Sequence, residues 1–375
     1  MNFKNAYIYT ENFKFEPGGF LVENGKFCKV LETPAENAVD LNGAFVIPGL
    51  IDIHTHGNSN IDFSDGDYDG DIKMAGYLAR NGITSFTPAT MTLPYETIGK
   101  ALAAGLKLKN NRPDNAARIL GVNMEGPFFS EKKKGAQNGE YLKLPDYSAF
   151  KKLYDDSEGL ISIIDLAPEL PGAIDFIKKA KADCVVSIAH TDANYEQAKA
   201  AIESGATHVT HLYNAMPSIH HREPGVIGAA SENENVKAEM ICDGIHVHPS
   251  AIRMAFKLFG ADRICLISDA LRCCGMPDGE YMLGGQKVRL ENNTARLEDG
   301  TLAGSASNLY TCMQNIIKFG IPKEIAVRTA TWNPACAIHQ ENLVGSIANG
   351  KLADFVICNE NLEPKEVYIN GEIVK

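Results

Sequence analysis

Two histidines one residue apart, His54 and His56, close an apolar run and have the types and spacing to bind a metal ion. Residues two apart in a β-strand project to the same side, so both imidazoles can hold one ion together. Four more polar residues follow other apolar runs in the same way: Glu125, His190, His211 and Asp269. Imidazole and carboxylate groups without a thiolate suit divalent zinc, iron, manganese or cobalt, with a position left open for water.

A divalent ion in such a site supplies hydrolytic chemistry, because it lowers the pKa of a coordinated water and polarises a carbonyl oxygen. Asp269 could take the proton of this water and pass it to a leaving amine. We therefore predict hydrolysis of an amide or ester, with Asp269 as the catalytic acid and base. The predicted metal ligands are His54, His56, Glu125, His190 and His211.

Each of these residues also has an ordinary explanation. A single histidine is commonly a hydrogen-bonded core or surface residue, Glu125 can pair with a nearby Lys or Arg, and Asp269 can cap the backbone after its strand. Their shared position at the ends of apolar runs favours the metal site, because random placement would not select these residue types there.

Recognition of a phosphate group would need separate donors. The candidates are Arg222, His246 and the backbone N–H groups of Asn214 and Ala215, in the turn after the sixth apolar run. In the alternative interpretation, Arg222 and Glu223 form a solvated surface pair.

The elements that must position these residues are eight apolar strand runs with helical patterns between most of them. The runs cover residues 45–53, 83–90, 117–124, 161–167, 184–190, 207–211, 236–242 and 263–268. Eight strands alternating with helices over about 250 residues are typical of an α/β fold of the (β/α)8 TIM-like barrel type. Active sites of such barrels lie at the carboxyl ends of the strands, where the polar residues above stand.

Both ends of the chain differ from this pattern. The first 43 residues and the last thirty contain short β-type runs, and Asn370-Gly371 is a strong hairpin signal. We predict a small β domain from residues 1–44 and 345–375, and a catalytic barrel over residues 45–344. Turn signals at Gly284-Gly285 and Asn292-Asn293 predict a β-ribbon insertion near residues 280–300.

Composition limits the partners and the compartment. The 375 residues carry a net charge of −11, which argues against nucleic acid or an anionic membrane as the main partner. The nine cysteines are odd in number and lack a CxxC pair, as is typical of a reduced, cytoplasmic protein. We find neither a signal-peptide pattern nor an apolar run of about 18 residues, so we expect no export and no membrane anchor.

Longer motifs resemble a known family. The phrases VIPGLIDIHTHG at residues 46–57 and GKLADFV at 350–356 resemble the amidohydrolase superfamily. Within it, the chain resembles the N-acetylglucosamine-6-phosphate deacetylase family. That resemblance rests on MEGPFF at 124–129, AHTDA at 189–193, THLYNAMP at 210–217, REPGVIGA at 222–229, DGIHV at 243–247, SDA at 268–270 and LAGS at 302–305.

This resemblance implies a fold and an activity. The fold is a distorted (β/α)8 barrel with a small β-sandwich domain from both termini, assembled as a homodimer. The activity is metal-dependent hydrolysis of the acetamide of N-acetylglucosamine 6-phosphate to glucosamine 6-phosphate and acetate, in amino-sugar catabolism and cell-wall sugar recycling. The implied partner is therefore a small phosphorylated amino sugar.

The resemblance also assigns roles to residues. It implies metal ligation by Glu125, His190 and His211, and catalysis by Asp269. It implies substrate binding by Ala136, Gln137, Asn214, Ala215, Arg222 and His246, with Leu302, Ala303 and Gly304 lining the sugar pocket. In such dimers, Arg222 or His246 can serve the site of the neighbouring subunit.

Two positions vary within the family. Because His54 and His56 are present, a second ion bridged through Glu125 is expected beside the first, with zinc as the favoured metal. Gln137 stands where other members have a histidine near the sugar, so N-acetylgalactosamine 6-phosphate is an alternative substrate. The chain could also be a cyclic-amide hydrolase or deaminase of the same superfamily, or a non-catalytic metal-containing scaffold.

Overall fold

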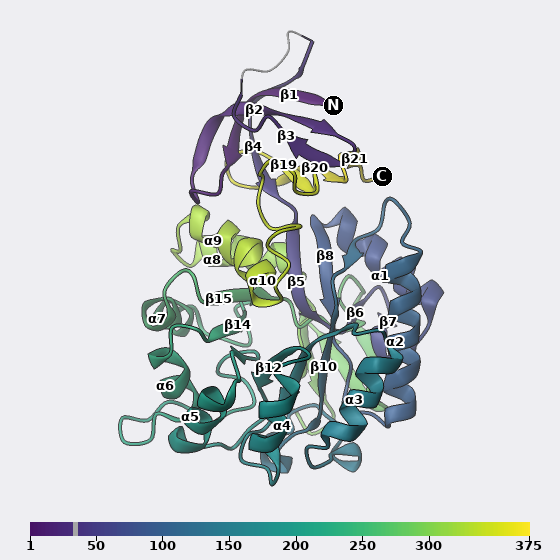
Figure 1. Cartoon of the computed structure of the whole chain (residues 1–375), viewed down its shortest axis with the longest axis vertical. Helices are drawn as coiled ribbons and strands as arrows, with labels where there is room; N and C mark the ends of the chain where they lie inside the picture. The colour runs from purple at the N-terminus through teal and green to yellow at the C-terminus, as the bar shows by residue number, and fades with distance from the viewer. Residues whose placement is uncertain (33–36) are drawn as a thin grey trace.

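A seven-stranded sheet contains both ends of the chain and lies apart from the other sheets (Figure 1). The computed structural model describes residues 1–32 and 37–375, so residues 33–36 of the predicted terminal domain lie outside the described residues. The strand order is β21-β20-β19-β4-β1-β2-β3. The bounds are Asn2–Tyr9 for β1, Phe15–Glu23 for β2, Lys26–Cys28 for β3, Val39–Pro48 for β4, Phe355–Cys358 for β19, Pro364–Ile369 for β20 and Glu372–Ile373 for β21.

Aromatic side chains hold this terminal sheet together. Phe3, Phe20, Phe27 and Phe355 are all buried, and the rings of Phe3 and Phe20 stack with their centroids 4.9 Å apart. Asn370 and Gly371 have φ angles of 52° and 77° and form the turn between β20 and β21, as two-residue hairpins require. The hairpin predicted from this dipeptide is confirmed.

The parallel strands form two further sheets. One has six strands in the order β10-β11-β12-β13-β14-β15, and the other has the order β5-β8-β9. Their bounds are Leu50–Thr55 for β5, Ile83–Pro88 for β8, Arg118–Ile119 for β9, Val122–Phe128 for β10, Ile161–Leu166 for β11, Val185–Ile188 for β12, His208–Val209 for β13, Lys237–Ile241 for β14 and Ile264–Ile267 for β15. Every apolar run predicted as a strand overlaps one.

The first predicted run, residues 45–53, is divided between two sheets. Gly49 ends β4, which pairs with β19 in the terminal sheet, and β5 then begins beside β8. A Cβ atom at Gly49 would lie 2.1 Å from Oγ1 of Thr84, so a side chain at this position would not fit.

The two parallel sheets are linked at two places. Ala89, just after β8, pairs with Asn123 in β10. Between β5 and β15, the backbone N–H of Asp269 donates to the carbonyl of His54 at 2.9 Å. The fold is therefore of the α/β class, with the carboxyl ends of β5 and β15 held side by side.

Helices follow most of the parallel strands. They are α1 (Tyr68–Arg80), α2 (Tyr95–Asn110), α3 (Tyr147–Asp156), α4 (Ala173–Ala180), α5 (Tyr195–Ser204), α6 (Gly225–Glu232) and α7 (Pro249–Phe259), then α8 (Leu309–Lys318), α9 (Lys323–Ala330) and α10 (Trp332–Ala337). Helix α7 illustrates the local code: His248 caps its start, Ile252 and Phe259 are buried on one face, and Gly260 ends it with φ 72°. Helices α8 to α10 lie between the terminal sheet and the parallel strands (Figure 1).

A three-stranded antiparallel sheet covers part of the segment 280–300. It contains β16 (Gly279–Leu283), β17 (Gln286–Glu291) and β18 (Thr294–Leu297). Its buried Leu283 packs in one apolar cluster with Met91 and Ala303. Nε2 of Gln286 donates to the carbonyl of Ala136, 2.8 Å away, so this sheet contacts the loop after β10.

The remaining short elements lie in loops. They are β6 (Gly57–Asn58), β7 (Ile61–Asp62) and the 3-10 turns η1 (Phe63–Asp65), η2 (Glu131–Lys133) and η3 (Gly139–Tyr141). All nine cysteines are free thiols. Among the described residues, no helix combines the length and apolar character needed to cross a membrane.

Candidate metal centre

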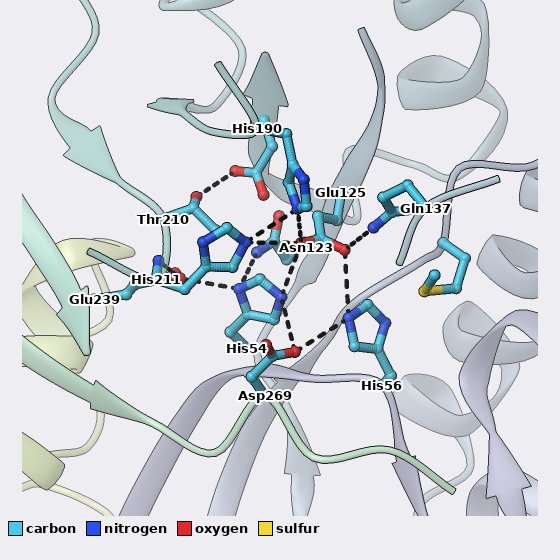
Figure 2. Close-up of polar contacts among 12 residues, drawn as sticks. His54, His56, Asn123, Glu125, Gln137, His190, Thr210, His211, Glu239 and Asp269 are labelled. Atoms are coloured by element: carbon cyan, nitrogen blue, oxygen red, sulfur yellow. Dashed lines mark hydrogen bonds and ion pairs between the residues drawn. The ribbon is translucent and has the colours of Figure 1, made fainter. Parts of the chain in front are cut away.

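The six residues predicted to do chemistry meet at the carboxyl ends of the parallel strands (Figure 2). His54 lies in β5 and Glu125 in β10, and His56 follows β5 directly. The other three, His190, His211 and Asp269, each stand two residues after the end of a strand, β12, β13 and β15 respectively. Residues more than 200 positions apart in the sequence are thus gathered at one place.

These last three residues share an unusual backbone conformation. The φ angles are 43° at His190, 30° at His211 and 47° at Asp269, in a region that side-chain-bearing residues rarely adopt. Such a conformation costs of the order of 1–2 kcal/mol per residue and persists where the surrounding structure imposes it. The same left-handed conformation occurs at three equivalent strand ends, and all three side chains lie in the site.

Glu125 is at the centre of the cluster. Its Oε1 atom lies 3.2 Å from Nε2 of His190 and 3.3 Å from Nε2 of His211, and these two nitrogens lie 3.1 Å apart. Its Oε2 atom lies 3.3 Å from Nε2 of His56. Two groups therefore have ligand atoms within 4.8 Å of one another, His54–His56–Glu125 and Glu125–His190–His211, and they share this carboxylate.

The donor atoms fit a divalent ion. Nδ1 of His190 lies 3.0 Å from the carbonyl of Lys133, which leaves its Nε2 facing Glu125. Nε2 of His54 is buried, has no hydrogen-bond partner among residues 1–32 and 37–375, and lies 3.5 Å from Oε1 of Glu125. Buried imidazole nitrogens that converge on a carboxylate are typical of a metal site, and at His54 and His190 the second ring nitrogen is held by another group.

The carboxylates of the site are held in their charged form. Burial opposes ionisation of Glu125, but hydrogen bonds to His190, His211 and His56 keep its pKa well below the usual value. Burial likewise opposes the ionisation of Asp269, yet His56 and His54 lower the pKa of its carboxyl. Conversely, hydrogen bonds to Asp269 and Glu125 raise the pKa of His56 to about 10 against the effect of burial.

Glu239 contacts this cluster and was not predicted from the sequence. It lies in β14 with no exposed surface, and its Oε2 is 2.9 Å from Nδ1 of His54. Asn123 of β10 also approaches this nitrogen, at 3.3 Å (Figure 2). The available signal was a glutamate inside the apolar run 236–242, where an ionisable side chain needs a buried partner.

A cavity of about 290 Å³ opens onto the metal cluster. His56, Glu125, His190, His211 and Asp269 line it, together with eight of the predicted substrate residues: Ala136, Gln137, Asn214, Ala215, His246, Leu302, Ala303 and Gly304. A larger hollow of about 670 Å³ lies over β17 and β18, but its lining contains neither histidine nor a metal-ligating cluster.

Two of these lining residues are fixed by specific contacts. Oε1 of Gln137 accepts a hydrogen bond from the backbone N–H of Thr92 at 2.8 Å, and its Nε2 donates to Oε2 of Glu125. Nδ1 of His246 lies 2.7 Å from Asp243, and its Nε2 lies 2.8 Å from the carbonyl of Ala303. Hydrogen bonding to Asp243 raises the pKa of His246 although burial opposes the charged form.

Arg222 is the one predicted substrate residue outside the cavity lining. Its side chain is exposed, and its Nη1 lies 2.8 Å from Nε2 of His221. Glu223, which could have formed a surface pair with it, instead accepts a hydrogen bond from the backbone N–H of Tyr195.

Comparison with known proteins agrees with this geometry. Residues 45–374 match the model of the amidohydrolase family. The chain is 37% identical over 340 residues to an N-acetylglucosamine-6-phosphate deacetylase of Vibrio furnissii, covering 90% of this chain and 85% of the relative. It is 33% identical to an N-acetylgalactosamine-6-phosphate deacetylase of Escherichia coli O157:H7, covering 98% of this chain and 97% of the relative.

A solved structure has the same fold. It is a mutant of the N-acetyl-D-glucosamine-6-phosphate deacetylase of Mycobacterium smegmatis in complex with N-acetyl-D-glucosamine-6-phosphate, with a TM-score of 0.91 at 31% identity. The match covers 100% of this chain and 99% of that one. The chain belongs to the amidohydrolase family.

Proposed function

We propose that this chain hydrolyses the acetamide of N-acetylglucosamine 6-phosphate to glucosamine 6-phosphate and acetate, in amino-sugar catabolism and cell-wall sugar recycling. The observation that carries the proposal is the pair of ligand groups around Glu125 with Asp269 beside them, at the wall of one cavity. The relatives named for this reaction cover nearly the whole chain.

The metal would be held by Glu125, His190 and His211, and a second ion by His54, His56 and the shared Glu125. Zinc is the favoured metal because the donors are imidazole and carboxylate, although iron, manganese and cobalt accept the same set. A bound divalent ion lowers the pKa of coordinated water and polarises the acetamide carbonyl.

Asp269 is the catalytic acid and base of the proposal. Its Oδ1 lies 3.3 Å from Nε2 of His56, and its side chain lines the cavity. The lowered pKa of its carboxyl keeps it ionised, which is the form that can accept a proton from the attacking water. It then donates that proton to the sugar nitrogen as the C–N bond breaks and acetate leaves.

The other lining residues would orient the sugar. Asn214, Ala215 and His246 line the cavity and would bind the phosphate, for which Nε2 of His246 and the backbone N–H of Asn214 must leave the carbonyls of Ala303 and His211. Leu302 to Gly304, Ala136 and Gln137 border the sugar. Contacts to the phosphate are remote from the reacting carbonyl, so their binding energy positions the amide for attack.

We further propose a homodimer in which Arg222 serves the site of the neighbouring subunit. Arg222 is exposed and outside its own cavity, which fits a role across an interface. Three apolar side chains are also exposed, one just before Arg222 in the sequence and two after β14. Ile219, Ile245 and Met254 are 47%, 37% and 54% exposed. A second subunit would cover them.

The finer organisation of the fold is also part of the proposal. We infer that the two parallel sheets close into one (β/α)8 barrel over residues 45–344, supported by the links between their edges. The terminal sheet would form a small β-sandwich domain from residues 1–44 and 345–375. The pairing of β19 with β4 extends as far as Pro48. The free cysteines support a cytoplasmic location.

An acetate-release assay on metal-analysed protein tests the function. We expect efficient hydrolysis of N-acetylglucosamine 6-phosphate and a much lower kcat/KM for the unphosphorylated sugar. Equal kcat/KM for both would refute the phosphate contacts, and no acetate release from a metal-loaded protein would refute the activity. Faster hydrolysis of N-acetylgalactosamine 6-phosphate would select the second candidate, which the relative from Escherichia coli O157:H7 supports.

A further inference from the structure

We propose that Glu239 is a positioning residue that turns His54 into a metal ligand and so gives the site its second divalent ion. The inference rests on the metal centre of the proposed function and adds to it a residue outside the ligand set. Glu239 does not line the cavity, and it has no direct contact with Glu125 or Asp269 within hydrogen-bond distance among the described residues.

The first step is the orientation of the His54 ring. Oε2 of Glu239 lies 2.9 Å from Nδ1 of His54, closer than the amide nitrogen of Asn123 at 3.3 Å. An ionised carboxylate can only accept, so Nδ1 carries a proton, and in the neutral imidazole that binds a metal the lone pair is then on Nε2. That lone pair belongs to the atom 3.5 Å from Oε1 of Glu125 and 3.8 Å from Oδ1 of Asp269.

The second step is the rigidity of Glu239 itself. Its Oε1 lies 3.2 Å from Nε2 of His208, and the backbone N–H of His211 donates to its Oε2 at 3.3 Å. Both carboxylate oxygens are therefore fixed by three donors. These are His54 of β5, His208 of β13, and His211, which stands two residues after β13. One buried side chain thus holds His54, from one ligand group, and the backbone of His211, from the other.

The cluster is rich in negative charge. Glu125, Glu239 and Asp269 are three carboxylates within the cluster, and their ion pairs are with histidines, with no lysine or arginine among them in the described part of the chain. Buried charges of one sign require compensation. The three carboxylates carry a charge of −3, so one divalent ion leaves −1, and the cluster can accept a second ion at His54 and His56 without a large excess of positive charge.

A role limited to folding gives a different expectation. Glu239 also joins β14 to β13 through His208, so its removal could weaken the sheet without any specific effect on metal. His208→Gln provides the matched control, because His208 is buried and in neither ligand group, and a glutamine amide can still donate to Glu239. Glu239→Gln preserves the size and one accepting oxygen while it removes the charge.

The test measures zinc per subunit in purified full-length protein. Wild type and His208→Gln should each hold two zinc ions, and Glu239→Gln should keep one tightly. The second zinc of Glu239→Gln should bind at least about tenfold more weakly in competition with a fluorescent chelator, the usual effect of losing an outer carboxylate. The double variant Glu239→Gln/His54→Ala should lose no more zinc than His54→Ala alone.

The remaining outcomes are equally decisive. Two zinc ions of unchanged affinity in Glu239→Gln would overturn the inference, and so would equal weakening in His208→Gln. A single zinc in wild type would also overturn it while the proposed hydrolysis could still be measured. Two zinc ions without any acetate release would refute the proposed function and leave the role of Glu239 standing. Should Glu239→Gln not fold, Glu239→Asp, which retracts the carboxylate, must weaken the second zinc specifically for the inference to survive.

Discussion

Oε2 of Glu125 lies 3.3 Å from Nε2 of His56, while its Oε1 faces His190 and His211. One carboxylate therefore belongs to two ligand groups, and each histidine belongs to one of them. This arrangement makes the effects of removing individual histidines separable.

Loss of His190 and loss of His56 should affect different ions. His190→Ala should remove the ion of the Glu125–His190–His211 group, and with it hydrolysis, because two protein ligands remain there. His56→Ala should leave that ion bound and lower only the occupancy at the other group. Elemental analysis of dialysed protein measures both, and a full complement of metal in His190→Ala would contradict its assignment as a ligand.

Asp269→Asn should abolish most turnover without loss of metal. Asparagine fits the left-handed backbone at this position, where φ is 47°, so the change isolates the proton transfer from the fold. We expect kcat to fall by about a hundredfold or more, as for other general acids and bases. Steady-state assay and metal analysis of the same sample check this, and turnover near the wild-type rate would show that another group carries the proton.

The sequence pattern predicted that the candidate ligands would meet, because each stands at the end of an apolar run and strand ends meet in a parallel α/β fold. It could not predict the left-handed backbone at His190, His211 and Asp269, which depends on tertiary packing at each strand end. It also could not predict that Gln137 accepts a hydrogen bond from Thr92, because Thr92 is far away in the sequence and contributes only its backbone N–H.

Other differences have similar causes. The run 45–53 is apolar throughout, so composition alone could not locate the change of sheet at Gly49, which follows from close contact with Thr84. Glu239 is one carboxylate within an apolar strand, and its significance depends on which residues face it across the sheets. Arg222 was predicted from a motif, but the sequence could not show that its side chain lies outside the cavity lining, because that depends on how the loop folds.

Stability should depend on pH through Asp71. This carboxyl is buried in α1 and has no hydrogen-bond partner in the described part of the chain. Burial together with the charges of Asp67, Asp65 and Asp62 raises its pKa to about 8. The unfolded carboxyl has a pKa of about 3.9. Between these values the folded state keeps a proton that the unfolded state has released, so stability falls as pH rises, and the loss is complete above about pH 8.

Asp71→Asn removes this dependence. At pH 4 the Tm of the variant should be close to that of wild type. The difference should grow with pH and reach the order of 5 °C at pH 8. Asp69→Asn, an exposed change in the same helical turn, is the control and should show no such trend. Thermal unfolding of metal-loaded protein across this range tests the prediction. An Asp71→Asn effect independent of pH would mean that Asp71 titrates normally.

Subunit complementation should reveal where Arg222 acts. Arg222→Ala should raise KM for the phosphorylated sugar by about 10- to 100-fold, because a charge-assisted hydrogen bond is lost. Asp269→Asn is nearly inactive by itself. If Arg222 reaches the neighbouring site, a heterodimer of the two variants contains one site with both native residues, and it should show half the wild-type kcat at the wild-type KM. Differently tagged chains, co-expressed and purified through both tags, provide that heterodimer. A heterodimer with the high KM of Arg222→Ala would place Arg222 in the site of its own chain, since no site would then combine the two native residues.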